Sequence, residues 1–369
     1  MSQREHDLDW LRILVVLMMV PFHTALVFTG PGFMFVKSGT HGPWFWAFVG
    51  FTYSWSMPLL FFISGAGAWF SLKKRGPVGF LRERLERLVP PPLLGLLVLV
   101  PFSAYLTHLQ TASAPVTLWT FLGAHFAHPR VVDLYWGHIW FLVVLLLLAA
   151  LGLPALLALR TVSVRGLRTR TAAALRTPGV LLLAAIPLAA VAPLPDESGL
   201  PAFGWAMLAP QAVAYAAGFL LFSQPALREA IDRNLWPAMA IAVSLALLSI
   251  WVPLHTRRDL VPHVVFYLGR WAWVLTALGL GHRFLDHGSA LGRYLREAGL
   301  PLYLLHVPVA SAIAFVVVDR PWPVAAQFTV ITAGTFACSF IIYELVVRRF
   351  RVLRWLFGLK RGAVRPQIP

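Results

Sequence analysis

The stretch WLRILVVLMMVPFHTALVFTG, residues 10–30, decides the fold class of this chain. Its 21 residues include one charged side chain, that of Arg12. A helix needs about 20 mostly apolar residues to cross the hydrocarbon core of a bilayer. The acidic segment HDLD, residues 6–9, and the lack of a small-residue cleavage site argue against a cleavable signal peptide. We therefore predict that the stretch is a membrane-spanning helix.

The rest of the chain has the same apolar character. Of its 369 residues, 59% are hydrophobic and 12% are charged, whereas soluble domains have about 25% charged residues. This balance excludes intrinsic disorder, a coiled coil and an ordinary cytosolic enzyme. The single cysteine, Cys338, excludes an intramolecular disulfide and a cysteine-based metal site. We predict an all-α polytopic integral membrane protein.

Apolar runs between charged residues and Pro/Gly breaks predict about ten transmembrane helices. They cover roughly residues 10–30, 44–71, 88–110, 136–159, 179–195, 202–223, 235–253, 263–285, 299–318 and 322–347. The segment at 179–195 is the shortest and is flanked by prolines. No repeat with a period of 20–50 residues is present, which argues against a solenoid.

The positive charges are distributed unevenly between the loops of this arrangement. With the N-terminus inside, 24 of the 31 Lys and Arg residues fall in inner segments and 5 fall in outer ones. Lys and Arg are enriched in the cytoplasmic loops of membrane proteins. We therefore predict that both termini are cytoplasmic. The net charge of +16 then reflects orientation rather than nucleic-acid binding.

Seven ionisable side chains fall within or at the ends of the predicted spans, where such groups are costly and usually functional. They are Asp9, Arg12, His23, His138, Arg270, His306 and Glu344. Arg12 and His23 are eleven residues apart, so they lie on one helix face about 16 Å from each other. This pair indicates a pathway with a cation at its entrance and a proton acceptor within it. The alternative is an interfacial arginine and a histidine that bonds to a neighbouring helix.

A basic segment, residues 73–90, follows the second predicted span. Its spacing predicts a short cytoplasmic helix on which Arg84 and Arg87 are one turn apart. These arginines either retain the loop in the cytoplasm and contact anionic lipid or bind the phosphates of a nucleotide-bearing donor. Both interpretations stay open at this point.

The other two histidines lie in short apolar motifs. His306 is followed closely by Pro308, and a proline within a helix frees a carbonyl and often shapes a cavity. His138 begins HIWFL, at the outer end of the fourth predicted span. Aromatic belts lie at this water–lipid boundary, so the alternative is that His138 is simply an interfacial residue. His23, His138 and His306 lack a close ligand pair and acidic partners, so we predict no metal site.

These segments resemble, in order, those of the membrane-bound acyltransferase 3 family. Arg12, ten further residues and His23-Thr24 resemble the hallmark of that family. PLLFFISG, residues 58–65, with RERLERLVP, residues 82–90, is similar to its next block. HIWFL, residues 138–142, and YLLH, residues 303–306, match two further motifs.

The last span and tail, residues 343–358, resemble the branch that includes glucan biosynthesis protein C, a periplasmic glucan succinyltransferase. The resemblance covers nearly the whole chain. We assign an acyltransferase 3 transmembrane domain to residues 1–350 and a basic cytoplasmic tail to residues 351–369.

The resemblance implies a multi-pass enzyme of the bacterial cytoplasmic (inner) membrane. Its reaction would move an acyl group from cytoplasmic acyl-CoA, as succinyl-CoA or acetyl-CoA, to a hydroxyl of an extracytoplasmic glycan such as periplasmic glucan. His23 is then the expected general base, or a covalent acyl carrier. Arg12 or Asp9 would position the donor or the inner gate, while His306 or His138 would orient the sugar or donate to the oxyanion. The residues expected to bind the donor are Arg82, Arg84, Arg87, Lys74 and Ser64.

Arg270 carries a separate hypothesis. A succinyl donor has a free carboxylate, for which a buried arginine is a natural partner. The alternative is that Arg270 pairs with Glu344 or with backbone carbonyls.

The competing class is a transporter or flippase of a glycan or its precursor, whose cavity would also contain histidine and arginine. The expected partners are acyl-CoA, a carbohydrate and the lipid bilayer, with no nucleic acid and no metal. The sequence leaves open the acyl group, the acceptor and its position, the covalent or direct route, and the oligomeric state.

Overall fold

The computed structural model describes residues 5–30, 36–127, 137–160, 165–191, 205–224, 226–251 and 260–360. Within these ranges the chain is helical and contains no β-strand, which confirms the predicted all-α class. Several predicted loop and tail charges lie outside the described residues. These are Arg4, Arg130, Arg257, Arg258 and the charges within residues 361–369.

In the described part of the chain, six helical stretches are long and apolar enough to cross a membrane. They are His6–Val27, Pro43–Thr111, Leu227–Leu248, Val264–Leu285, Ala290–Val317 and Val324–Val347. Shorter apolar helices cover Gly137–Ala150, Val180–Val191 and Leu208–Leu221. The second stretch has 69 residues, more than twice the roughly 20 that one crossing needs, so it contains both predicted spans at 44–71 and 88–110. The number of crossings and the side of each terminus stay predictions.

Most of the helices overlap the predicted apolar runs, whereas those at 118–127, 165–174 and 351–356 lie outside them. The helices are α1 (His6–Val27), α2 (Pro43–Leu88), α3 (Pro90–Leu94), η1 (Gly95–Leu99), α4 (Val100–Thr111), α5 (Leu118–Ala127), η3 (Gly137–Ile139), α6 (Trp140–Ala150), α7 (Leu153–Ala158), α8 (Arg165–Ala174), η5 (Val180–Ala184), α9 (Ala185–Val191), α10 (Trp205–Leu221), α11 (Leu227–Trp251), α12 (Leu260–Leu285), α13 (Ala290–Val317), α14 (Val324–Ile342), η6 (Tyr343–Val347) and α15 (Arg351–Leu356).

The short helix predicted within residues 73–90 is present as the last part of α2 (Pro43–Leu88), after a kink in the helix. It is separated from the preceding span by Gly76, which is not helical, with a φ of 72° and a ψ of 179°. This conformation is accessible to glycine and strained for other residues. Pro77, which follows, cannot donate a backbone hydrogen bond across the bend.

The chain divides into two compact units. Unit 1 contains Met1–Arg12, Phe51–Glu83 and Val144–Gly292, and unit 2 contains Ile13–Gly50, Arg84–Val143 and Arg293–Pro369. Residues 351–360 of the predicted tail therefore belong to unit 2, where α15 contacts α3.

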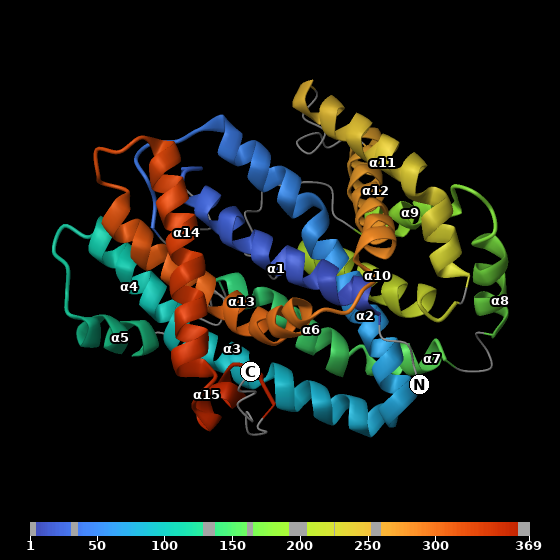
Figure 1. Ribbon diagram of the computed structural model, residues 1–369, viewed down its shortest axis with the longest axis horizontal. Helices are drawn as coiled ribbons and strands as arrows, with labels where there is room; N and C mark the ends of the chain where they lie inside the picture. Colours follow the sequence, from blue (N-terminus) through green and yellow to red (C-terminus); the bar gives the residue numbers. More distant parts are fainter. Residues whose placement is uncertain are drawn as a thin grey trace. The chain divides into compact units, whose positions relative to one another are not determined.

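In unit 1, α11 and α12 pack side by side (Figure 1), and α9 packs against both α10 and α12. The core contains large aromatic side chains from several helices. Phe62 of α2 contacts Trp271 of α12 with ring centroids 5.6 Å apart. The Trp271 indole donates to the Leu181 carbonyl at 2.6 Å, so its one polar atom is satisfied inside the apolar core.

Helices α2 and α10 cross at two glycines of unit 1. A Cβ added at Gly65 would lie 1.9 Å from the Tyr215 carbonyl oxygen, and one at Gly218 would lie 1.9 Å from the Phe62 carbonyl oxygen. The two backbones are therefore in direct contact. Small residues permit such close helix packing in membranes, where no hydrophobic force drives helices together.

In unit 2, α13 supplies much of the core, since residues 301–308 are all buried. A Cβ at Gly95 of η1 would lie 2.7 Å from Ile139, so η1 packs directly on the turn η3. Helix α14 packs against α13 where Gly334 faces Ile313. Helices α4 and α5 also lie side by side in this unit (Figure 1).

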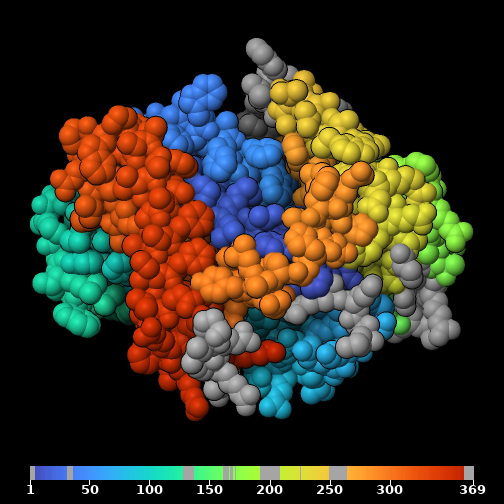
Figure 2. All heavy atoms as spheres, viewed as in Figure 1, coloured from blue at the N-terminus to red at the C-terminus, as the bar shows by residue number. Residues whose placement is uncertain are grey.

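Each unit has a helix whose outward side is apolar. In unit 1, Trp236 and Leu247 of α11 are 52% and 57% exposed, and in unit 2 Ile341 of α14 is 54% exposed. Both helices lie at the surface of the face drawn in Figure 2, α11 in yellow and α14 in red. Large apolar side chains on the outer face of a spanning helix contact lipid rather than water.

Candidate active site

Three histidines from distant parts of the sequence meet inside unit 2. His23 lies on α1, His138 on η3 and His306 on α13. The His306 Nε2 and His23 Nδ1 atoms are 3.0 Å apart. Ring centroids are 4.7 Å apart for His23 and His306, 5.2 Å for His138 and His306, and 6.4 Å for His23 and His138. We call this group the histidine centre.

Backbone carbonyls determine which nitrogen of His306 and His23 carries a proton. The His306 Nδ1 atom is 2.6 Å from the Tyr303 carbonyl oxygen. A carbonyl only accepts hydrogen bonds, so this nitrogen is the donor, and in neutral His306 the Nε2 atom is an acceptor. The His23 Nδ1–H then points toward both His306 Nε2 and the Met19 carbonyl, which is 2.9 Å away. The Nε2 lone pair of neutral His23 is left for another partner.

His138 is held by the same turn of α13. Its Nε2 atom donates to the Leu304 carbonyl at 3.0 Å, and its own carbonyl accepts a hydrogen bond from the Tyr303 hydroxyl. His138 and His306 are 6% and 1% exposed. His23 is less enclosed, with intermediate exposure. The centre is therefore fixed at two imidazoles and accessible at the third.

The part of the chain that the structure describes contains no group of three or more His, Cys, Asp or Glu side chains arranged to hold a metal ion. The chemistry that the centre can perform with its own groups is proton transfer and hydrogen bonding. An imidazole that hydrogen-bonds a second, oriented imidazole can accept a proton at its other nitrogen.

Asp9 and Arg12 lie together near the start of α1. The Arg12 Nη1 and Asp9 Oδ1 atoms are 3.8 Å apart, and their side chains are 43% and 20% exposed. Both belong to unit 1, whereas His23 belongs to unit 2. The helix that carries all three is continuous, as predicted.

The residues predicted to bind the donor are split between the units. Ser64, Lys74 and Arg82 belong to unit 1, and Arg84 and Arg87 belong to unit 2. Lys74, Arg82 and Arg87 are exposed, and the Ser64 hydroxyl donates to the Leu60 carbonyl at 2.7 Å. The structure thus brings Arg84 and Arg87 together on the last turns of α2 and does not gather all five residues within one unit.

Arg270, on α12 in unit 1, lies in a box of aromatic rings. Its guanidinium carbon is 5.7 Å from the centroid of Tyr53, 5.3 Å from Phe266 and 5.3 Å from Tyr267. Its Nε atom donates to the Ser54 carbonyl at 2.7 Å, which is one of the predicted alternatives. Among the described residues no acidic side chain forms an ion pair with Arg270.

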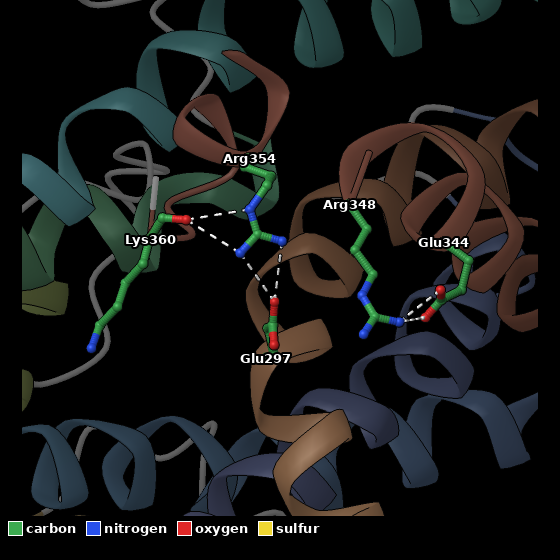
Figure 3. Close-up of polar contacts among 5 residues, drawn as sticks. All are labelled: Glu297, Glu344, Arg348, Arg354 and Lys360. Carbon is green, nitrogen blue, oxygen red and sulfur yellow. Dashed lines mark hydrogen bonds and ion pairs between the residues drawn. The ribbon is translucent and has the colours of Figure 1, made fainter. Parts of the chain in front are cut away.

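Glu344 pairs within unit 2 with Arg348, one helical turn away. The Arg348 Nη1 atom is 2.9 and 3.1 Å from the two carboxylate oxygens of Glu344 (Figure 3). This hydrogen bonding raises the pKa of Arg348. Close by, Arg354 of α15 binds Glu297 at 3.3 Å and the Lys360 carbonyl at 3.2 Å (Figure 3). These contacts attach the end of the described chain to α13.

Sequence reasoning missed several groups of the site. Tyr303 and the Leu304 carbonyl hold His138 in place. The sequence signal for this contact was Pro308, which predicts a carbonyl without its helical donor. Lys37 counted only as an outer charge, yet its Nζ donates to the Leu26 carbonyl at 2.8 Å, one turn beyond His23 on α1. Burial lowers the pKa of Lys37 to about 8.

The fold and the centre define a class of protein: a multi-pass membrane protein in which three histidines from distant parts of the sequence meet. The family model described as an acyltransferase domain, acyltransferase 3, matches residues 5–344. The chain therefore belongs to the acyltransferase 3 family, as its motifs predicted, and it is a membrane acyltransferase.

Curated relatives support the same assignment. The glucans biosynthesis protein C of Salmonella paratyphi B is 24% identical over 380 residues, which is 97% of this chain and 96% of that protein. The protein of the same name from Salmonella heidelberg is 24% identical over 388 residues, with the same coverage. The predicted likeness to this branch is confirmed. No solved structure matches the chain significantly.

Proposed function

We propose that this chain is an inner-membrane O-acyltransferase that uses cytoplasmic acyl-CoA to acylate a hydroxyl of an extracytoplasmic glycan, and periplasmic glucan in particular. The observation that carries the proposal is the 3.0 Å contact between His23 and His306. It leaves the second ring nitrogen of His23 as a base. The names of the relatives support a glucan acceptor.

The chemistry needs little beyond a base, because a thioester carbonyl is already activated. His23 Nε2 takes the proton of the acceptor hydroxyl as its oxygen bonds to the thioester carbon. The tetrahedral intermediate then expels the CoA sulfur, the ester forms, and the proton on His23 passes to the leaving thiolate. His306 Nε2 and the Met19 carbonyl stabilise the transient imidazolium, because both accept from His23 Nδ1. A covalent acyl-His23 intermediate is the other route.

The remaining residues have supporting roles in this proposal. Arg84 and Arg87 bind CoA phosphates, since guanidinium groups match phosphate oxygens in forked geometry. Arg12 and Asp9 position the donor at the start of α1. His138, in the tautomer that Leu304 imposes, accepts a hydrogen bond and thus orients the sugar hydroxyl rather than donating to an oxyanion.

The proposal is tested with the purified full chain in lipid nanodiscs. We expect succinyl-CoA or acetyl-CoA to release free CoA thiol in the presence of a glucan oligosaccharide, with a matching acyl mass increase on the sugar. A glycan flippase, the competing class, would leave acyl-CoA intact and show no mass increase. That result would contradict the proposal.

Arg270 gives a prediction about the acyl group. We propose that its guanidinium binds the free carboxylate of a succinyl donor. A charge-assisted hydrogen bond contributes about 1.5–3 kcal/mol. We therefore expect Arg270→Gln to lower kcat/KM for succinyl-CoA about 10- to 100-fold and to leave acetyl-CoA within about threefold.

Arg160 provides the matched control for this experiment. It also belongs to unit 1, lies 5.8 Å from the centroid of Trp69, and donates to the Leu72 carbonyl at 3.4 Å. Arg160→Gln should affect both donors equally. Equal losses of the two activities in Arg270→Gln would remove Arg270 from donor recognition.

A further inference from the structure

The prolines of α13 leave two backbone carbonyls without their usual helical donors. In an α-helix the carbonyl of residue i accepts from the N–H of residue i+4. Pro308 has no N–H, so the Leu304 carbonyl lacks that partner, and Pro301 has the same effect on the Glu297 carbonyl. A buried carbonyl without a partner costs free energy, so a substitute donor is expected.

His138 supplies the substitute donor at Leu304. Its Nε2 atom is 3.0 Å from the Leu304 oxygen, although the two residues are 166 positions apart in the sequence. Leu304 is fully buried and His138 is 6% exposed, so water does not compete with this bond. The missing N–H of Pro308 thus creates the acceptor that orients the His138 ring.

The orientation determines the tautomer of His138. Because Leu304 can only accept, His138 Nε2 carries the proton, and Nδ1 of the neutral ring is an acceptor. The Nδ1 atom is buried and has no hydrogen-bond partner among the residues that the structure describes. A buried acceptor left unpaired costs free energy, and a donor on a ligand would remove that cost.

Tyr303 belongs to the same turn of α13 and contacts both histidines. Its hydroxyl donates to the His138 carbonyl, and its own carbonyl accepts from His306 Nδ1. One turn of α13 therefore fixes both His138 and His306, the two enclosed members of the histidine centre.

We propose that Pro308 and Tyr303 are positioning residues that hold His138 in its Nε2–H form, and that His138 Nδ1 accepts a hydrogen bond from a hydroxyl of the carbohydrate acceptor. The assignment of the ligand rests on the proposed function, whereas the assignment of the tautomer rests on geometry alone. His23 removes the proton from the reacting hydroxyl, and His138 binds a hydroxyl of the same sugar.

The tautomer is measured by nitrogen NMR of the full chain with ¹⁵N-labelled histidine in nanodiscs, with His138→Gln to assign the signal. We expect wild-type His138 to show a protonated Nε2 and an unprotonated Nδ1. Pro308→Ala restores an N–H that competes for Leu304, so the His138 signal should shift toward a mixture of tautomers. Pro301→Ala is the matched control, a buried proline on the same helix, and should leave the signal unchanged.

Kinetics test the ligand assignment. We expect Pro308→Ala and Tyr303→Phe to raise KM for the glucan acceptor about tenfold and to leave KM for acyl-CoA unchanged, with normal elution on size exclusion. A wild-type His138 protonated at Nδ1, or equal spectra and kinetics for Pro308→Ala and Pro301→Ala, would overturn the positioning role. A KM rise for acyl-CoA instead of glucan would overturn the acceptor role of Nδ1.

The two arms also separate this inference from the proposed function. If the wild-type chain transfers no acyl group while His138 keeps the Nε2–H form, then the proposed function and the sugar ligand both fail. The positioning of His138 by Pro308 would stand in that case, because the NMR measurement needs no substrate.

Discussion

Replacing His23 with alanine is expected to lower the rate of acyl transfer about 10²- to 10⁴-fold, the usual contribution of a general base. The physical reason is that His23 is the least enclosed ring of the histidine centre, and its contacts with Met19 and His306 both involve Nδ1, which leaves Nε2 as a base. Without it, the only remaining unpaired ring nitrogen of the centre among the described residues is that of His138, which is buried and, in this proposal, binds the sugar rather than removing its proton. The measurement is mass spectrometry of acylated glycan from cells with confirmed membrane levels of each variant.

His125 on α5 provides a control for this prediction, since it is a histidine of unit 2 outside the centre. His125→Ala should retain wild-type acylation. Undiminished product from His23→Ala would remove His23 from the mechanism. His306→Ala should give an intermediate loss, because it removes the partner of the imidazolium but leaves the base in place.

Replacing Gly65 with alanine is expected to prevent normal folding of unit 1. A Cβ at this position would lie 1.9 Å from the Tyr215 carbonyl oxygen and 2.9 Å from the Phe219 nitrogen. Ordinary overpacking costs about 1–3 kcal/mol because side chains can move aside. Here the obstructing atoms are backbone, so α2 and α10 must separate. We expect a loss of monodisperse protein on size exclusion or a marked fall in Tm.

Gly50 provides the matched control on the same helix, because a Cβ there meets no atom within 4 Å. Gly50→Ala should keep or slightly raise Tm, since alanine favours helix over glycine. The same Tm for Gly65→Ala and Gly50→Ala would show that α2 and α10 do not cross in direct backbone contact. Gly218→Ala tests the opposite side of the crossing and should behave as Gly65→Ala does.

The order of the helices could be predicted from the sequence because a membrane leaves few alternatives. Apolar runs of about 20 residues must form helices in lipid, where each backbone polar group needs an internal partner. The bend at Gly76 and the close crossing at Gly65 could not be located in this way. A glycine in an apolar run has the same composition whether it faces lipid or another backbone.

The candidate site divides in a similar way. His23, His138 and His306 could be predicted as site residues because ionisable residues within spans are rare and usually functional. Each of the three also lies in a short motif. Arg84 and Arg87 could also be placed one turn apart from their spacing alone. How Ser64 and Lys74 relate to these two arginines could not be predicted, because local spacing does not carry across the bend at Gly76.

By itself the sequence determined the helical membrane class, the acyltransferase 3 family and the three histidines, because these depend on composition and on short motifs. Only the tertiary structure decided that the three rings meet and which nitrogen of His138 carries the proton. His138 and Leu304 are 166 positions apart, and His23 and His306 are 283 apart. A tautomer is set by the nearest acceptor in space. For His23 and His306 that acceptor is a carbonyl of the same helix, whereas the acceptor of His138 comes from a helix that only folding brings alongside it.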